Sequence, residues 1–246
     1  MAKAQVSGRT GLARALSKLG YCSRTQAFSL IRSGRVRLNQ RVDRDPETPV
    51  RLDKDRIEVD GKNVGPAGRV YLMLNKPRGL VTTRSDEKCR KTIYSLLPGS
   101  SEWLAPVGRL DMASEGLLFL TNDSAWGARI SAPEAQINKT YHVQIDALAD
   151  QKLIDRLHHG VRNGDEDSLA AKRARILRLG KKNSWLEIVL DEGKNRHIRR
   201  MLSELGIEVL RLLRVAVGPV ALGDLPKGKT RLLTGEEKEA LAGKKF

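Results

Sequence analysis

The 246-residue sequence lacks several features, and each absence excludes a class of protein. No apolar run approaches the ~20 residues that a membrane-spanning helix needs, so we expect no membrane partner. The first residues hold no apolar signal core, and we therefore expect a cytoplasmic protein. The two cysteines, Cys22 and Cys89, lie far apart in the sequence, which supports neither a disulfide framework nor a zinc knuckle.

Aromatic and acidic residues are both scarce. Aromatics make up only 4% of the chain, which argues against an extended stacking platform for bare single strands and favours a folded RNA with one extruded base. Lysine and arginine number 45 against 29 acidic residues, a net charge of +16, which indicates a polyanionic partner. Residues 1–42 carry nine basic residues and no acid, so the excess is strongest at the N-terminus.

The first 60 residues predict two small helices on a short twisted sheet. Apolar spacing predicts a helix from Leu12 that ends at Gly20, and a capping box at Ser23 starts a second helix that ends near Gly34. Short strands are expected at 36–42 and 57–59. We interpret the basic residues of this segment as phosphate-binding rather than merely solvated: Arg14, Lys18, Arg24, Arg32, Arg35 and Arg37.

A change of composition predicts the domain boundary. Three glycines and a proline between Gly61 and Gly68 are typical of a linker, so we divide the chain into residues 1–62, a linker at 63–68 and residues 69–246. The longer part combines alternating strands with interspersed helices, expected around 153–161 and 198–205, and has no repeating βαβ unit. We therefore predict an α+β fold whose mainly antiparallel sheet is flanked by helices.

One motif is misleading. Residues 223–230 satisfy the phosphate-loop pattern G-x-x-x-x-G-K-T, which would suggest an NTPase. Such a loop must open a helix, but Gly235 interrupts the following segment, and only 16 residues remain after Thr230. We reject the NTPase and interpret the segment as a basic surface loop. The four histidines have no partners at metal-ligand spacing, so we expect no metal site.

Two further segments could carry chemistry. Asp111 lies in a glycine-flanked loop that runs into an apolar strand, a position that suits a functional residue. Taken alone, the segment is also consistent with a simple surface ion pair between Arg109 and Asp111. Arg196, Arg199 and Arg200 surround the start of an amphipathic helix, where positive charge opposes the helix dipole. That placement makes sense if a carboxylate such as Asp111, or a phosphate, lies nearby.

Together these segments resemble the ribosomal RNA pseudouridine synthases, in the branch of small-subunit synthase A and large-subunit synthases B, E and F. The resemblance rests on residues 108–111, 138–143 and 191–202, and on residues 76–79, which match the family's Lys-Pro-x-Gly motif. Segments 12–20, 23–27, 31–39 and 55–59 resemble the RNA-binding module named after ribosomal protein S-four.

The resemblance implies a role for individual residues. Asp111 matches the nucleophile, Tyr141 the aromatic residue that stacks on the target base, and Arg199 the basic partner of the aspartate. Arg109 matches the arginine that fills the gap left by the flipped base. We expect further RNA contacts from a basic group around these positions: Lys76, Lys194, Arg196 and Arg200. The sequence departs from the family pattern with Lys194 for arginine and His197 for glutamine.

The predicted function is the isomerisation of a specific uridine in ribosomal RNA to pseudouridine, by base flipping and without a metal or nucleotide cofactor. The alternative is a non-catalytic RNA-binding factor in ribosome assembly. The sequence leaves open which subunit's RNA is modified and whether the aspartate attacks the anomeric carbon or the pyrimidine ring. No spare apolar stripe is evident, so we expect a monomer.

Overall fold

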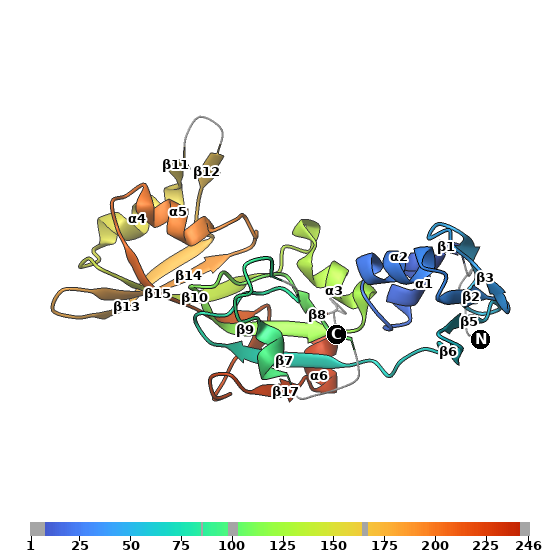
Figure 1. Ribbon diagram of the computed structural model, residues 1–246. Helices are drawn as coiled ribbons and strands as arrows, with labels where there is room; N and C mark the ends of the chain where they lie inside the picture. Colours follow the sequence, from blue (N-terminus) through green and yellow to red (C-terminus); the bar gives the residue numbers. More distant parts are fainter. Residues whose placement is uncertain (1–7, 85, 98–102, 164–166, 242–246) are drawn as a thin grey trace. The chain divides into compact units, whose positions relative to one another are not determined.

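The computed structural model describes residues 8–84, 86–97, 103–163 and 167–241 (Figure 1). The chain forms two compact units. Of the described residues, the first unit contains 8–71, 103–105 and 120–127, and the second contains 72–97, 106–119 and 128–241. Both units combine helices with sheet, so the predicted α+β class is confirmed. No helix within the described ranges is long and apolar enough to cross a bilayer.

The helices of the first unit begin and end near the predicted residues. They are α1 (Leu12–Lys18) and α2 (Arg24–Arg32). The capping box forms, because Ser23 Oγ accepts a hydrogen bond from the Gln26 amide and Gln26 Oε1 accepts one from the Ser23 amide. Gly20 and Gly34 follow the two helices with φ values of 77° and 74°, the left-handed conformation that glycine adopts without strain.

A small sheet packs against these helices. Its antiparallel order is β3 (Arg41–Val42), β2 (Val36–Leu38), β5 (Ile57–Val59) and β6 (Lys62–Asn63), and a separate pair is formed by β1 (Thr10–Gly11) and β4 (Pro49–Val50). Both hairpin turns have two residues of positive φ, as tight hairpins require. The core of this unit is small and is filled mainly by Leu12, Leu16, Ala27, Ile31, Val36 and Ile57.

The predicted linker is hydrogen-bonded within the first unit. The Val64 amide donates to the Ile57 carbonyl, and the Ala67 amide donates to the Leu19 carbonyl. Asn122, which is fully buried, donates from its side chain to the Gly68 carbonyl. The segment 120–127, more than 50 residues away, also belongs to this unit, which was not predicted because such a contact leaves no local pattern in the sequence.

One large sheet organises the second unit. Its strand order is β13 (Arg173–Leu179), β14 (Ser184–Leu190), β10 (Lys139–Ile145), β15 (Val209–Val217), β9 (Glu115–Thr121), β7 (Tyr71–Lys76) and β17 (Thr230–Leu232), with β16 (Val220–Ala221) on β15 and β8 (Ala105–Val107) on β9. The first four strands are antiparallel neighbours, whereas β9 and β15 run parallel.

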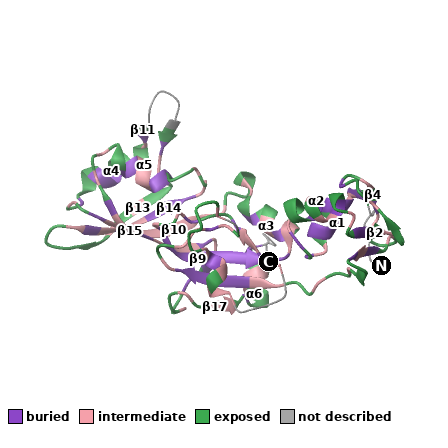
Figure 2. Cartoon of the chain, in the orientation of Figure 1, coloured by how far each residue is buried: buried purple, intermediate pink, exposed green. Residues whose placement is uncertain are grey.

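Helices α4 (Gln151–His159) and α5 (His197–Ser203) lie over one face of strands β13, β14, β10 and β15 (Figure 1). Their apolar side chains form the main core with those of the strands, and this core is coloured as buried in Figure 2. Both helices end two residues before the expected position. Gly160, with φ 90°, ends α4 so that Val161 lies in a strand, and Leu205 follows the end of α5.

The remaining elements are short. They are α3 (Ser124–Ser131), α6 (Gly235–Leu241), the 3₁₀ helices η1 (Ile93–Leu96) and η2 (Pro133–Ala135), and the hairpin of β11 (Val161–Asn163) and β12 (Asp167–Leu169).

Candidate active site

The loop between β8 and β9 carries Asp111. Backbone and side-chain hydrogen bonds hold this loop on both sides of the aspartate. Thr82 Oγ1 donates to the Leu110 carbonyl at 2.7 Å, and the Gly79 amide donates to the Met112 carbonyl at 2.7 Å. The Asp111 side chain itself remains 32% exposed. The loop is therefore anchored through its backbone, and the carboxylate is left accessible.

Lys76, at the end of β7, is the central anchor of the loop. Its side chain is fully buried, and its ammonium donates to the carbonyls of Pro77, Asp111 and Ser114 at 3.2, 3.1 and 2.9 Å. Burial lowers the pKa of Lys76 to about 8, although Asp111 and Glu115 oppose this shift. The prediction that Lys76 contacts RNA is therefore wrong, because a fully buried ammonium bound to three carbonyls cannot reach a phosphate.

Asp111 lies in a cavity of about 610 Å³ within the second unit. The structure brings five of the predicted site residues to the lining of this cavity: Arg109, Asp111, Tyr141, Lys194 and Arg196. The carboxylate and the tyrosine, 30 positions apart in the sequence, thus share one cavity. The distribution of charge is uneven, since several cations surround the aspartate, and this arrangement suits an anionic ligand.

The predicted pair between Asp111 and Arg199 is absent from the ion pairs of the described residues. Arg199 donates instead to the carbonyls of Val209 and Ala113, both at 3.1 Å. The cation nearest to the carboxylate is Arg196, whose Nη1 lies 4.0 Å from Asp111 Oδ2. The predicted ion pair between Asp111 and Arg199 is therefore wrong, and the reason is the geometry of α5. Arg196 precedes the first helical turn and lines the cavity, whereas Arg199 lies within the helix against the backbone of the loop.

Arg199 is therefore a second anchor of the loop. Burial lowers the pKa of its guanidinium, the neighbouring charges of Arg196 and Arg78 lower it further, and the charge of Asp111 opposes the shift. The hydrogen bond from Arg199 to the Ala113 carbonyl holds the loop against α5 two residues after Asp111. Arg199 thus acts on the carboxylate through the loop backbone and through its charge.

Arg196 has an unusual backbone conformation. Its φ of 48° and ψ of 31° place it in the left-handed region at the start of α5, where residues other than glycine are uncommon. The side chain is largely exposed, so water screens its attraction to Asp111. Of the other predicted RNA contacts near this helix, Lys194 lies 3.5 Å from Glu192 and Arg200 is half-buried.

Two cations of the cavity were not predicted. Arg214 on β15 is only 6% exposed, and its Nε donates to the Leu117 carbonyl at 2.7 Å. Lys139 on β10 is half-buried, and burial together with the charge of Arg214 lowers its pKa, while Asp191 opposes the shift. The signals were present, because Lys139 lies two residues before Tyr141 on one strand face, and Arg214 interrupts an apolar strand.

Gly116 allows β15 to approach the Asp111 loop closely. Its φ is 102°, and a Cβ at this position would lie 2.3 Å from the Arg214 carbonyl oxygen. Only glycine fits both the backbone angle and this contact. The residue therefore permits the β9–β15 pairing that brings Arg214 beside the aspartate loop.

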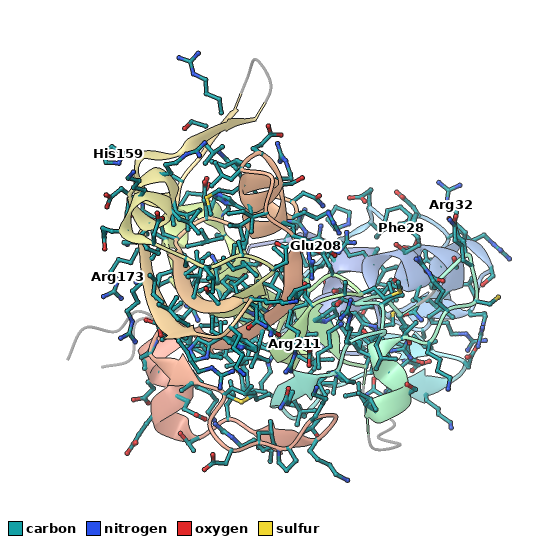
Figure 3. The ribbon with its side chains drawn as sticks, turned by 90° about the vertical axis from the view of Figure 1, so that its left-hand side faces the viewer. Phe28, Arg32, His159, Arg173, Glu208 and Arg211 are labelled. Atoms are coloured by element: carbon teal, nitrogen blue, oxygen red, sulfur yellow. The ribbon has the colours of Figure 1, made fainter. Side chains whose placement is uncertain are left out.

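The first unit holds a separate basic surface. Arg14 and Arg24 line a cavity of about 380 Å³ together with Arg9 and Phe28. The predicted contacts Lys18, Arg32 and Arg37 are exposed, and Figure 3 labels Phe28 and Arg32 on α2. Arg35 is exposed as well, but it forms a 2.5 Å ion pair with Asp60, which neutralises part of its charge. The other five cations form no ion pair with any residue that the structure describes.

The phosphate-loop motif does not have the structure of a nucleotide site. Thr230 begins strand β17, which pairs antiparallel with β7, whereas a phosphate loop is followed directly by a helix. Lys227 in this loop binds Glu115 at 2.5 Å. The rejection of an NTPase is confirmed.

Comparison with known proteins places the chain in a family. The family model described as RNA pseudouridylate synthase matches residues 70–204, more than half of the chain. The chain belongs to the RNA pseudouridylate synthase family. It is therefore a pseudouridine synthase, and the enzyme is favoured over the non-catalytic RNA-binding factor. The S4 domain model matches residues 10–57, as the resemblance of the N-terminal segment predicted.

The synthase is similar to relatives over nearly its whole length. It is 41% identical to an uncharacterized RNA pseudouridine synthase of Aquifex aeolicus, over 90% of this chain and 89% of the relative. It is 34% identical to the ribosomal large subunit pseudouridine synthase B of Bacillus subtilis, over 94% of both chains. A solved pseudouridylate synthase structure superposes with a TM-score of 0.67 at 28% identity and covers 94% of this chain and 99% of that chain.

Proposed function

We propose that the synthase converts a specific uridine of ribosomal RNA to pseudouridine, with Asp111 as the nucleophile and the target base flipped into the cavity. The observation that carries this proposal is the Asp111 carboxylate, which lies on a loop anchored by Lys76 and Arg199 and shares a cavity with Tyr141 and several cations. Ribosomal RNA as the substrate is supported by the similarity to a ribosomal large subunit synthase and by the S4 domain.

The reaction needs a carboxylate held in one place. The C1′–N1 bond of the uridine breaks, a C1′–C5 bond forms, C5 loses a proton and N1 gains one, so no oxidation occurs and no water is consumed. Asp111 adds to the anomeric carbon or to the pyrimidine ring, and both routes regenerate the carboxylate. The anchors Lys76 and Arg199 fix the loop that carries the carboxylate.

Base flipping supplies the access that this chemistry needs. A uridine within a helix must be extruded at a cost of a few kcal/mol. Stacking on the Tyr141 ring would return about 1–3 kcal/mol, and phosphate contacts from the exposed arginines of the first unit would contribute the remainder. The proposal thus connects the basic N-terminal unit with the cavity through the RNA.

The experiment uses transcripts of small- and large-subunit ribosomal RNA with tritium at C5 of uridine, since isomerisation releases this tritium to water. We expect release from one transcript with the wild-type protein. Asp111→Asn removes the nucleophile while keeping its size, so turnover should fall more than 1,000-fold on the scale typical of a lost nucleophile, while RNA affinity stays within about threefold.

Asp155→Asn is the matched control, because Asp155 is exposed on α4 and its side chain accepts only from Gln151 among the described contacts. It should turn over like the wild type. Unreduced release by Asp111→Asn would contradict the nucleophile assignment. Release from neither ribosomal transcript would contradict the assignment of the substrate.

A further inference from the structure

The strands β13, β14, β10 and β15 have two different faces. One face packs on α4 and α5 and contains the apolar side chains of Val143, Leu186 and Ile188 (Figure 1). Because neighbouring residues of a strand point to opposite faces, the residues between these lie on the other face. That face reaches solvent, since the side chains of Arg175 and Arg211 are 67% and 42% exposed. We call it the open face.

The strand register arranges the open face in rows. The first row consists of Arg178, Trp185, Gln144 and Arg211, one residue from each strand, because each is paired with the next. A register irregularity between Ile176 and Arg178 brings Arg178 rather than Leu177 opposite Trp185. The second row, in the same order of strands, consists of Arg175, Glu187, His142 and Leu213.

Trp185 is the one aromatic side chain in these two rows, and cations lie on both sides of it. The Arg211 guanidinium lies 5.6 Å from the centre of its ring, within range of a cation–π interaction. Arg178 is its partner on the neighbouring strand. A half-exposed aromatic ring between arginines on a sheet surface is suited to stacking an unpaired base and binding the adjacent phosphates.

The carboxylates on the open face are already neutralised. Glu187 binds Arg175 at 2.7 Å and lies 3.4 Å from His142. Glu115, whose backbone pairs with Leu213, binds Arg211 and Lys227. In contrast, Arg173 and Arg178 form no ion pair with any described residue, and Arg173 lies at the outer edge of the sheet in Figure 3. The charge left over is positive.

A protein partner fits these side chains less well. The centres of protein interfaces are depleted in charge and rich in apolar side chains. The two rows hold only Trp185 and Leu213 as large apolar side chains among cations and amides. Excess positive charge around one planar ring is complementary to a polyanion with planar bases.

We propose that the open face binds a short unpaired segment of the RNA, with one base stacked on Trp185 and phosphates held by Arg173 and Arg178. The proposal rests on the proposed function, because it names a second contact of the same RNA substrate. The site is distinct from the Asp111 cavity, since Tyr141 packs against the core on the helix-covered face of the same strands.

The test measures affinity of the full-length protein for a fluorescein-labelled single-stranded RNA 12-mer and for the same strand in a blunt duplex. Trp185→Ala should weaken binding of the single strand roughly 5- to 150-fold, as expected for one lost stack, and leave duplex binding within about twofold. Trp185→Phe keeps an aromatic ring and should stay within about threefold of the wild type. This pattern separates stacking from a general structural defect.

Two double variants that remove the same charge test the phosphate contacts while Trp185 is kept. The double variant Arg173→Ala and Arg178→Ala should reduce the slope of log affinity against log salt by about 1.4 for the single strand. The control Lys152→Ala and Arg156→Ala removes the same charge from the exposed side of α4 and should leave the slope within about 0.3 of the wild type.

Failure of this proposal is distinguishable from failure of the proposed function. Unchanged single-strand affinity in Trp185→Ala, with normal tritium release, would overturn the open-face site, leave the synthase reaction intact and point to a protein partner for the face. Equal losses in both double variants would also overturn the site. Tritium release that survives Asp111→Asn would contradict only the proposed nucleophile, whatever the affinities are.

Discussion

The basic residues around the aspartate loop of the second unit have a different environment from those on the surface of the first unit. In the second unit, Lys76, Arg199 and Arg214 are buried or half-buried, and each donates to backbone carbonyls around the aspartate loop or the adjacent strand. In the first unit, Arg14 and Arg24 are exposed beside a small cavity. The buried cations organise the loop, whereas the exposed ones are available to phosphate.

Burial and hydrogen-bond partners, rather than residue type, therefore separate a positioning cation from an RNA-binding one. A buried ammonium is retained only where acceptors satisfy it, so its removal should disturb the structure around it. An exposed guanidinium contributes little to folding and much to the attraction of a polyanion. Substitutions at three sets of basic residues test this distinction.

The largest effect is expected at Lys76. Lys76→Met keeps the length of the side chain but removes the ammonium that donates to the carbonyls of Pro77, Asp111 and Ser114, so the free energy of unfolding in urea should fall by about 1–3 kcal/mol. Tritium release should fall at least 100-fold because the Asp111 loop loses its anchor, while RNA affinity changes less than threefold.

The control for Lys76 is Lys152→Met, because Lys152 is exposed on α4. It should unfold at the same urea concentration as the wild type and keep full turnover. A large loss of RNA affinity in Lys76→Met, with normal stability, would show that the comparison between the two units is wrong.

An intermediate effect is expected from the two arginines near Asp111. Arg199→Gln removes the hydrogen bonds to Val209 and Ala113, so turnover should fall about 10- to 100-fold and stability by about 1–2 kcal/mol. Arg196→Gln removes only an exposed, weak ion pair, and its stability should stay within about 0.5 kcal/mol.

Single-turnover tritium release measures the effect of Arg199→Gln and Arg196→Gln on turnover, and urea unfolding measures their effect on stability. If Arg196→Gln were the less stable protein, the role of Arg199 as an anchor of the loop would be refuted.

The smallest effect on folding is expected in the first unit. The triple variant of Arg14, Arg24 and Arg32 to alanine removes three exposed charges, so the free energy of unfolding should change by less than about 0.5 kcal/mol per site. The slope of log affinity against log salt for ribosomal RNA should fall by about 2–3. Arg35→Ala is the internal control, because its charge is already paired with Asp60, and it should change the slope least.

An unchanged slope in the triple variant would remove these arginines from the RNA interface. The exposed cations of the first unit would then not bind phosphate, and exposure would no longer distinguish an RNA-binding cation from a positioning one.

The local features of the chain and the polyanionic character of its expected partner could be predicted from the amino-acid sequence. The helices near Leu12 and Ser23, with their caps and following glycines, depend on contacts within a few residues, so local spacing was sufficient to predict them. The net charge of +16 indicated a polyanion without any coordinates. The motif around Asp111 indicated the family, which the comparisons confirmed.

The roles of the individual cations could not be predicted in this way, because they depend on the folded arrangement of the chain. Three features all depend on segments that are far apart in the sequence: the burial of Lys76, the hydrogen bonds of Arg199 to carbonyls, and the alignment of Trp185 with Arg211 across three strands. Nothing in a local pattern reports how deeply a charged side chain is buried or which residue lies opposite it on a neighbouring strand, because strand order and register are set by packing of the whole sheet. The sequence therefore identifies a lysine of a motif as a positive charge, and the fold determines whether that lysine contacts a phosphate or a backbone carbonyl.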